Sequence, residues 1–334
     1  MKKNEFYFNK NVLVAGGTGM VGQMLVPKLI KLGANVYISS LDHKSLCPKG
    51  IKGFYSRDLI YLENCIKVTK NKDIVFNLLG STGSPKINMI KPASFMMSNL
   101  YCAINMLMAS QINKVKNYLY TSTYGVYGKK GKMREDMVWK TFPSEHDKYA
   151  GWAKRIGELQ AEAFNKEFNS MNISVVRPAN IYGPHLNFNP TNSMVVASLI
   201  RRLINKEDPF VVWGDGSAIR DFVYSEDVAN AMIKILQKKI KQPLNIGSGT
   251  GTTIKNLVKS MFKSKFITNN PKVFFDKSKP SGDKKRVLDM KLSKKYRISC
   301  STNLETGLHK TIEWYLKFGK KISKKKYNYF LNKK

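Results

Sequence analysis

Three glycines close to the N-terminus have a spacing that suits phosphate binding. Gly16, Gly19 and Gly22 lie between an apolar run that predicts a short strand, Val12–Ala15, and a run that predicts a helix. The first glycine permits a tight turn, the second lets a pyrophosphate approach the backbone, and the third lets helix pack on strand. Because a helix N-terminus presents amide donors and a positive dipole end, this segment predicts a dinucleotide site.

A second set of polar groups ends a predicted strand further along the chain. Residues 120–128 read Tyr-Thr-Ser-Thr-Tyr-Gly-Val-Tyr-Gly and follow the apolar start of the run Asn117–Ser122. In a parallel sheet, ligands bind in the crevice outside the carboxyl ends of the strands. We therefore expect these hydroxyl groups to lie beside the bound dinucleotide.

The elements that must position these residues alternate along the chain. Strands are predicted at 12–15, 36–39, 73–79, 117–122 and 173–177, and helices at 20–32, 92–112 and 149–167. This order predicts an α/β fold with a Rossmann-type doubly wound parallel sheet. The alternation breaks after residue 180. We predict a dinucleotide-binding domain over 8–180, a smaller α+β and mostly substrate-binding domain over 181–318, and a basic tail over 319–334.

Composition narrows the class of protein. The 334 residues are 43% hydrophobic, which suffices for one large or two ordinary domains. The four cysteines are scattered, with neither a CxxC pair nor a histidine at metal-ligand spacing, so we expect reduced thiols, a cytoplasmic protein and no metal site. No apolar run reaches the roughly 18 residues of a membrane span, and the N-terminus lacks the apolar core of a signal peptide.

The net charge of +34 comes from basic residues spread through the whole chain. That spread favours a solvated basic surface that attracts anionic small molecules, rather than specific binding of nucleic acid. The dense cluster at 320–326 is expected to be a solvated or frayed end, with a membrane-surface contact as the alternative.

Two motifs resemble the extended short-chain dehydrogenase/reductase family, in particular its nucleotide-sugar epimerases, dehydratases and reductases. Thr123 with Val126-Tyr127-Gly128 resembles the Ser/Thr-x-x-Val-Tyr-Gly of that family. The run Arg177–Pro184 resembles Arg-Pro-x-Asn-x-Tyr-Gly-Pro. With further matches the resemblance covers residues 10 to 317 and is strongest to the GDP-fucose synthases. It implies a nucleoside-diphosphate sugar as substrate, and we also expect a homodimer.

The resemblance implies a catalytic set. Thr123 would hydrogen-bond the C4 oxygen of the sugar. The family's Tyr-x-x-x-Lys motif places a lysine at Lys154, which lowers the pKa of the tyrosine and holds the nicotinamide ribose. Its tyrosine position is Ala150, while Tyr149 stands one residue early. We predict that Tyr149 exchanges the C4 proton, presented by a π-bulge or by a helix that begins at Ala150; Thr123, His185 or water are the alternatives.

The same resemblance implies which residues bind the sugar nucleotide. Arginine and lysine suit a diphosphate, and tryptophan suits a base or a sugar face. The implied residues are Asn180, Arg201, Trp213, Arg220 and Lys279. His185 is present, but its cysteine partner in the GDP-fucose synthases is replaced by Gly125, which argues against a combined epimerase and reductase. Tyr124 and Gly125 also replace the Asp-Glu pair of the dehydratases, which argues against dehydration.

Cofactor choice depends on the end of the second strand. An acidic residue there binds the ribose hydroxyls of NAD, but this chain has Ser39 and Ser40, followed by Lys44. We therefore favour NADP(H), with Asp42 leaving NAD(H) open. The remaining expected cofactor contacts are Met20, Val21, Asp58, Leu59, Leu79, Gly80, Asn99 and Lys154.

These observations predict a nucleotide-sugar oxidoreductase that acts at the sugar C4 carbon, as an NAD(P)H-dependent reductase of 4-keto sugars. An NAD-dependent C4-epimerase is the alternative within the family, supported by Val126-Tyr127-Gly128. A non-catalytic Rossmann protein that binds nucleotide or RNA is the alternative of another class, because the displaced tyrosine and the high charge would suit it.

Overall fold

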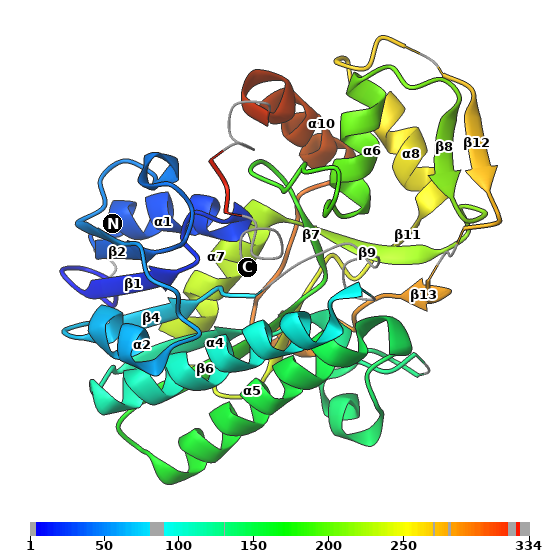
Figure 1. Cartoon of the computed structure of the whole chain (residues 1–334). Coiled ribbons are helices and arrows are strands. Elements are labelled where there is room, and N and C mark those ends of the chain that lie inside the picture. The colour runs from blue at the N-terminus through cyan, green and yellow to red at the C-terminus, as the bar shows by residue number, and fades with distance from the viewer. Residues whose placement is uncertain are drawn as a thin grey trace.

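The computed structural model describes residues 5–80, 90–129, 131–269, 271–279, 282–319 and 325–327. Figure 1 shows a large sheet with helices on its faces and, at the upper right, a group of shorter strands and helices that we call the small lobe. In the part of the chain that the structure describes, no helix is both long and apolar enough to cross a bilayer.

The large sheet has seven parallel strands in the order β10-β6-β5-β4-β1-β2-β3. Their bounds are β1 Asn11–Ala15, β2 Asn35–Ser39, β3 Gly53–Tyr55, β4 Ile74–Asn77, β5 Asn117–Thr121, β6 Asn172–Pro178 and β10 Leu244–Ile246. The strand order reverses between β1 and β4, and such a switch point opens a crevice at the carboxyl ends of the strands. The predicted fold class is confirmed.

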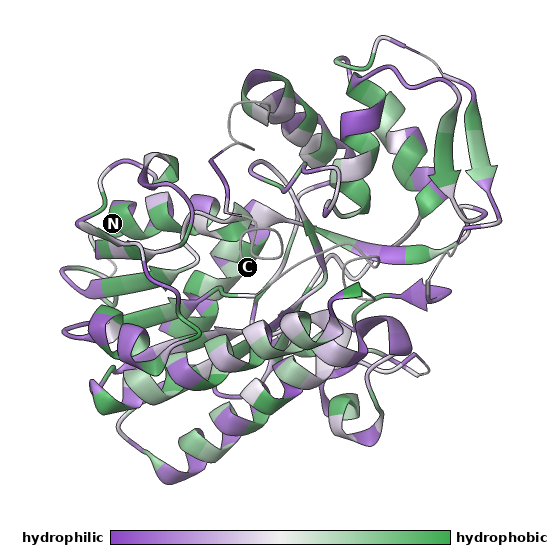
Figure 2. Cartoon of the chain, in the orientation of Figure 1, coloured by the Kyte–Doolittle hydropathy of each residue, from purple (hydrophilic) through white to green (hydrophobic). Residues whose placement is uncertain are grey.

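Helices cover both faces of this sheet. On one face lie α1, Met20–Lys31, and α7, Ser225–Gln237; on the other lie α2, Leu62–Thr69, α4, Pro92–Ile112, and α5, Lys148–Glu167. Strand β1 is buried on both sides, because Val12 and Val14 join the core with α1 and α7 while Leu13 joins the opposite core. Figure 2 shows strands of hydrophobic colour and helices with mixed faces, as a two-sided core requires.

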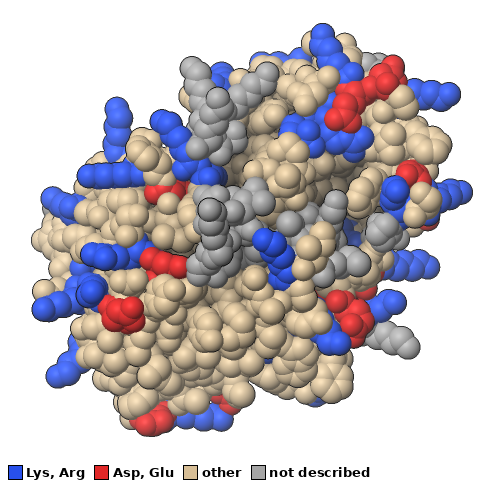
Figure 3. Space-filling model, in the orientation of Figure 1, with Lys and Arg blue, Asp and Glu red and all other residues tan. Residues whose placement is uncertain are grey.

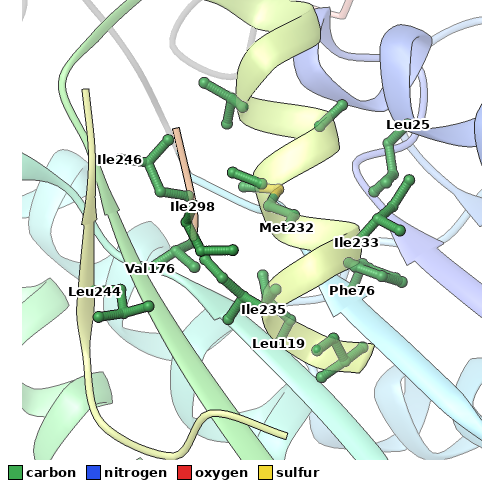
Figure 4. Close-up of a cluster of buried hydrophobic side chains, with 14 of the residues drawn as sticks. Leu25, Phe76, Leu119, Val176, Met232, Ile233, Ile235, Leu244, Ile246 and Ile298 are labelled. Atoms are coloured by element: carbon green, nitrogen blue, oxygen red, sulfur yellow. The ribbon is translucent and has the colours of Figure 1, made fainter. Parts of the chain in front are cut away.

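The chain returns to the large sheet after it has entered the small lobe. Helix α7 packs on α1, and β10 adds the edge strand beside β6. Figure 4 shows Met232 and Ile235 of α7 against Leu119 and Val176 of the strands, with Leu244 and Ile246 of β10 in the same cluster. Residues beyond 180 therefore contribute directly to the core beneath the site.

The small lobe holds two short sheets and a core of its own. Strand β9, Ile219–Tyr224, pairs with β7, Asn180–Tyr182, β11, Gly251–Thr253, and β13, Lys285–Arg286, while β8, Phe210–Trp213, pairs with β12, Val273–Asp276. Helices α6, Val195–Ile204, α8, Ile254–Phe262, and α10, Leu304–Trp314, cover them. A five-residue helix, α9, spans Lys291–Lys295.

A buried ion pair joins β6 to α5. Arg177 of β6 donates from Nε and Nη2 to the two carboxylate oxygens of Glu158 in α5, at 2.9 and 2.7 Å, and its Nη1 donates to Tyr127 Oη at 3.1 Å. Both charged side chains are about fully buried, at 1% and 2% exposure. Such a pair holds α5 against β6, because loss of either partner leaves an uncompensated buried charge.

We expect Glu158→Ala to lower the free energy of unfolding by about 3–5 kcal/mol, because Arg177 would keep its charge without a counterion. Denaturant titration measures the change. The matched control is Glu162→Ala on the same helix, whose exposed pair with Lys166 should be worth less than about 1 kcal/mol. Equal losses in the two variants would show that the buried pair has no special role.

Candidate active site

The glycine-rich turn has the geometry expected of a phosphate-binding loop. Gly16 has φ +81°, a conformation that strains other residues, and Gly19 is the N-cap of α1. A Cβ on Gly22 would lie 2.5 Å from the backbone of Gly17, so only glycine lets α1 pack this closely. Because no side chain caps the first turn of α1, the backbone amides of Met20 and Val21 are available to an anion.

The end of β2 forms a polar corner beside this turn. Thr18 Oγ1 is 2.6 Å from Ser40 Oγ and donates to Asp42 Oδ2 at 2.8 Å. Ser39 is buried and bonds back to Tyr55 O, whereas Lys44 is exposed at the start of a 3₁₀ turn, Lys44–Leu46. Ser40 and Asp42 are thus brought together, and Ser39 faces the sheet interior.

Part of the basic tail lies across this corner. His43 N donates to Lys325 O at 3.1 Å, and Tyr327 N donates to Asp42 Oδ1 at 2.7 Å. Lys326 Nζ donates to Thr18 O at 3.5 Å and to His185 O at 3.4 Å. The expected solvated or frayed end is therefore wrong for residues 325 and 326, because backbone and side-chain hydrogen bonds hold them on the protein; residues 320–324 lie outside the described part.

Lys154 carries a buried charge at the carboxyl ends of β4 and β5. Its Nζ donates to Leu79 O and Thr121 O, each at 2.9 Å, and the side chain is nearly inaccessible. A Cβ on Gly80 would lie 3.3 Å from both Lys154 Nζ and Asn99 Oδ1, so these groups converge on one point. Burial lowers the pKa of Lys154 to about 8.

Thr123 and Tyr124 follow the end of β5, two and three residues after Thr121, whose carbonyl accepts from Lys154. Thr123 is the N-cap of a 3₁₀ turn, Tyr124–Val126, and its Oγ1 accepts from Gly125 N at 3.1 Å. Tyr124 Oη donates to Asn180 Oδ1 at 2.9 Å, which joins the end of β5 to β7 of the small lobe. Burial raises the pKa of Tyr124, and the Asp147 carboxylate raises it further.

Neither arrangement expected to present Tyr149 is found. Helix α5 begins at Lys148 as a regular α-helix, without a π-bulge and without a start at Ala150. Tyr149 in the first turn is 39% exposed. The two arrangements were wrong because Asp147 already ends the preceding turn and the helical hydrogen bonds begin directly after it. The catalytic role of Tyr149 stays a prediction.

His185 lies in the loop after β7, where it contacts α10 of the small lobe. Its ring is 4.6 Å from the Trp314 ring, and its φ is +65°. Burial, together with the Lys326 charge, lowers the pKa of His185 to about 4, so the imidazole is neutral at pH 7.

The remaining expected substrate residues fall into separate places. Arg220 of β9 lies at the junction of the two parts, where its Nη1 donates to Asp283 O at 2.7 Å. Trp213 ends β8, is 56% exposed and lies opposite Asp276 in the pairing of β8 with β12. Lys279 follows β12 and donates its backbone N–H to Asp276 O. Arg201 lies in α6. Their roles in binding stay predictions.

Asp58 and Leu59 lie between β3 and α2. Asp58 Oδ1 accepts from Ile60 N at 3.3 Å, and Leu59 is buried with its carbonyl accepting from Cys65 Sγ. Asn99 in α4 is also buried and donates to Phe95 O at 2.8 Å. These local contacts fix the three residues in place, and their cofactor contacts stay predictions.

Two residues that the sequence analysis did not single out complete the junction. Arg286 of β13 is 3% exposed and donates from Nη1 to Asp283 Oδ2 at 2.7 Å and to Ser144 Oγ at 2.9 Å. The same Nη1 is 3.1 Å from Asp147 Oδ2, and Nη2 donates to Tyr124 O at 2.9 Å. Asp147 stands seven positions before Lys154, and this spacing is the feature of the sequence that could have drawn attention to it.

The site lies in a strongly basic molecule. Figure 3 shows lysine and arginine side chains around much of the outline of the drawn face, with a broad uncharged area over its lower centre, and fewer acidic side chains, in keeping with the net charge of +34. A distributed positive potential raises the local concentration of anionic ligands such as dinucleotides.

The fold and the site define a Rossmann-type dinucleotide-binding protein with a polar junction to a second lobe. The chain belongs to the NAD dependent epimerase/dehydratase family, which matches residues 12–247. It is 27% identical to a GDP-L-fucose synthase from Escherichia coli, over 92% of this chain and 97% of that protein. The identity to a GDP-L-colitose synthase from Yersinia pseudotuberculosis is 26%, over 91% and 97%.

A solved structure agrees with these relatives. A UDP-glucose 4-epimerase from Thermotoga maritima, crystallised with UDP-glucose, superposes with a TM-score of 0.79 at 28% identity over 92% of this chain and 99% of that chain. The resemblance inferred from the motifs is confirmed, and so is the expectation of an enzyme family that uses a nicotinamide cofactor.

The residues present fit such a cofactor. The uncapped start of α1 suits a diphosphate, and Gly19 leaves room for it, because a Cβ there would lie 3.2 Å from Gly16 O. Lys154 holds its charge beside Gly80, where a ribose hydroxyl would be a suitable acceptor. A nicotinamide cofactor would supply or accept a hydride, and these residues would bind and orient it.

The lowered pKa of Lys154 predicts a pH-dependent stability. Its folded pKa lies below the unfolded value of 10.5, so the unfolded chain binds more protons between pH 8 and 10.5 and stability rises with pH there. We expect wild type to gain on the order of 3 kcal/mol relative to Lys154→Met across that window. Parallel denaturant titrations measure it. Lys148→Met, at an exposed position of the same helix, is the control; a flat difference between wild type and Lys154→Met would contradict the prediction.

Proposed function

We propose that the protein reduces the 4-keto group of a nucleoside-diphosphate sugar with NADPH. The observation that carries this is the buried ammonium of Lys154, held between Leu79 O and Thr121 O, the latter two residues before Thr123 in the chain. A charge in that place would serve a ribose and a reacting carbonyl that meet at the sheet edge. Similarity along nearly the whole chain to GDP-sugar synthases supports a GDP-linked substrate.

Each part of the site has a task in that reaction. Thr123 stabilises charge on the C4 oxygen as the carbonyl becomes an alcohol. The ammonium of Lys154 positions the ribose and favours anionic character nearby. Arg220 of β9 faces the junction, where a diphosphate needs cationic partners. Asn180 belongs to β7, which pairs with β9, and donates from Nδ2 to the carbonyl of Asp221, the residue after Arg220.

A C4-epimerase remains the second candidate. It is favoured by the superposition on a UDP-glucose 4-epimerase and by Asp42, whose carboxylate accepts from Thr18 Oγ1, the same hydroxyl that contacts Ser40 Oγ, at the strand end where a ribose would bind. The two functions differ in cofactor use, because a reductase consumes NADPH each turnover and an epimerase does not.

We expect purified protein to oxidise NADPH stoichiometrically when given a GDP-4-keto-6-deoxy sugar, followed by absorbance at the nicotinamide band. Thr123→Val and Lys154→Ala should each reduce turnover at least about a hundredfold, the scale of a positioned donor or acid–base group. Lys166→Ala, exposed on the same helix as Lys154, should keep full turnover. Interconversion of GDP- or UDP-hexoses without NADPH consumption would favour the epimerase instead, and a bound but unreacted substrate would overturn both.

We also expect NADP⁺ to bind more tightly than NAD⁺, because Ser40 and Lys44 suit a 2′-phosphate. Ser40→Asp should reverse the order by placing a carboxylate at that position. Asp42→Asn should strengthen the preference, since it removes the one acidic group hydrogen-bonded to Thr18 there. Calorimetric titrations of the three proteins decide, and tighter NAD⁺ binding by wild type would refute the prediction.

A further inference from the structure

The proposed reduction needs a proton donor beside the sugar's C4 oxygen, and this inference rests on that proposed function. Position 150 is alanine, which has no proton to give. Tyr149 lies in the outward-facing first turn of a regular helix and is 39% exposed. A different group must therefore be sought close to Thr123.

We propose that Asp147 is the acid that protonates the C4 oxygen. The point where a Cβ on Gly125 would lie is 3.2 Å from Thr123 Cγ2 and 3.3 Å from Asp147 Cγ. The two side chains therefore flank one spot above the start of the 3₁₀ turn. Gly151 of α5 packs against Gly125 as well, since a Cβ on Gly151 would lie 2.6 Å from Gly125 O, so the start of the helix fixes Asp147 at this spot.

A purely structural role for the carboxylate does not account for this placement. Aspartate is favoured at helix N-caps because it accepts hydrogen bonds from the first amides. Asp147 is the N-cap of α5, yet its side chain makes no such bond. Its Oδ2 is instead 3.1 Å from Arg286 Nη1. Arg286 is already paired with Asp283 at 2.7 Å, so its charge has a counterion without Asp147.

The surroundings suit a group that carries and replaces a proton. Burial raises the pKa of Asp147, and Asp283 raises it further, whereas Arg286, His146 and Arg220 act in the opposite direction without cancelling the rise. The side chain is one-third exposed, so it can regain a proton from water after each turnover. Tyr124, with Oη bonded to Asn180, closes the other side.

The step balances with the groups named. A hydride from the dihydronicotinamide forms the new C–H bond at C4 as the carbonyl π bond breaks. The Asp147 O–H bond breaks, its proton joins the C4 oxygen, and the carboxylate remains beside Arg286. Thr123 Oγ1 orients the same oxygen, and water then returns a proton to Asp147.

The test compares hydride-transfer rates in single turnovers of NADPH with a GDP-4-keto-6-deoxy sugar. Asp147→Asn should reduce the rate at least about a hundredfold, while the dissociation constants for NADPH and substrate stay within about threefold. Asp147→Glu should recover part of the rate. Because the acid must be protonated, the wild-type rate should fall as pH rises, and this decline should be absent from the residual rate of Asp147→Asn.

Two control variants sharpen the comparison. Glu145→Gln removes a carboxylate from the same turn, where it is 84% exposed, and should leave rate and pH profile unchanged. Tyr149→Phe removes the competing proton donor that the sequence motif predicts, so it distinguishes that donor from Asp147. A full rate in Asp147→Asn, or a hundredfold loss in Tyr149→Phe with Asp147→Asn active, would overturn the inference while leaving the proposed function standing. Wild-type protein that never oxidises NADPH would instead overturn the proposed function, and this inference with it.

Discussion

The guanidinium of Arg286 is the contact on which the junction of the two parts depends. It belongs to a two-residue strand of the small lobe, yet its bonds reach Ser144, Asp147 and the Tyr124 carbonyl in the turns that follow β5 and precede α5. Its plane also lies over the Tyr124 ring, 4.8 Å from the centroid. A planar group with five donors can hold several acceptors in fixed directions. One side chain therefore sets the position of the small lobe against the end of β5, and with it the shape of the site between them.

Lys154 supplies the second constraint, which is electrostatic. Its charge sits where water is excluded, so burial works against the ammonium, and two carbonyl oxygens and the Tyr120 ring, whose centroid is 5.2 Å from Nζ, offset only part of that penalty. Such an arrangement persists in proteins where a ligand completes the surroundings of the charge. Arg177 differs from Lys154 in this respect. Its charge is equally buried but is matched by the Glu158 carboxylate, and the pair serves the fold. The presence of a carboxylate partner at Arg177, and of carbonyl oxygens instead at Lys154, therefore distinguishes the structural cation from the functional one.

Sequence reasoning located the elements with strong patterns. The glycine turn, the long helices and the buried strands β1, β2, β4, β5 and β6 follow from periodicity and turn chemistry, and Lys154 follows from its place on a helix. Strands β3 and β10 have three residues each, too few to show alternation, so the width of the sheet was not apparent. Asp147 was missed because its environment is assembled by Arg286, which is remote in sequence, and by the absence of a side chain at Gly125. The tail contacts of Lys326 were missed because a lysine-rich run has the composition of a solvated end.

Gly125 and Asp147 are physically connected. A Cβ at position 125 would lie 3.2–3.3 Å from both Thr123 and Asp147, closer than most packed side chains tolerate, so any larger residue would push the carboxylate away from the threonine. Gly125, which departs from the family's pattern, therefore leaves the room that Asp147 occupies, in a chain that also lacks the tyrosine of the family at position 150. Taken together with the proposed role of Asp147, the departures from the family's pattern are explained by one change. The proton donor has moved from the face of α5 to the turn that precedes this helix.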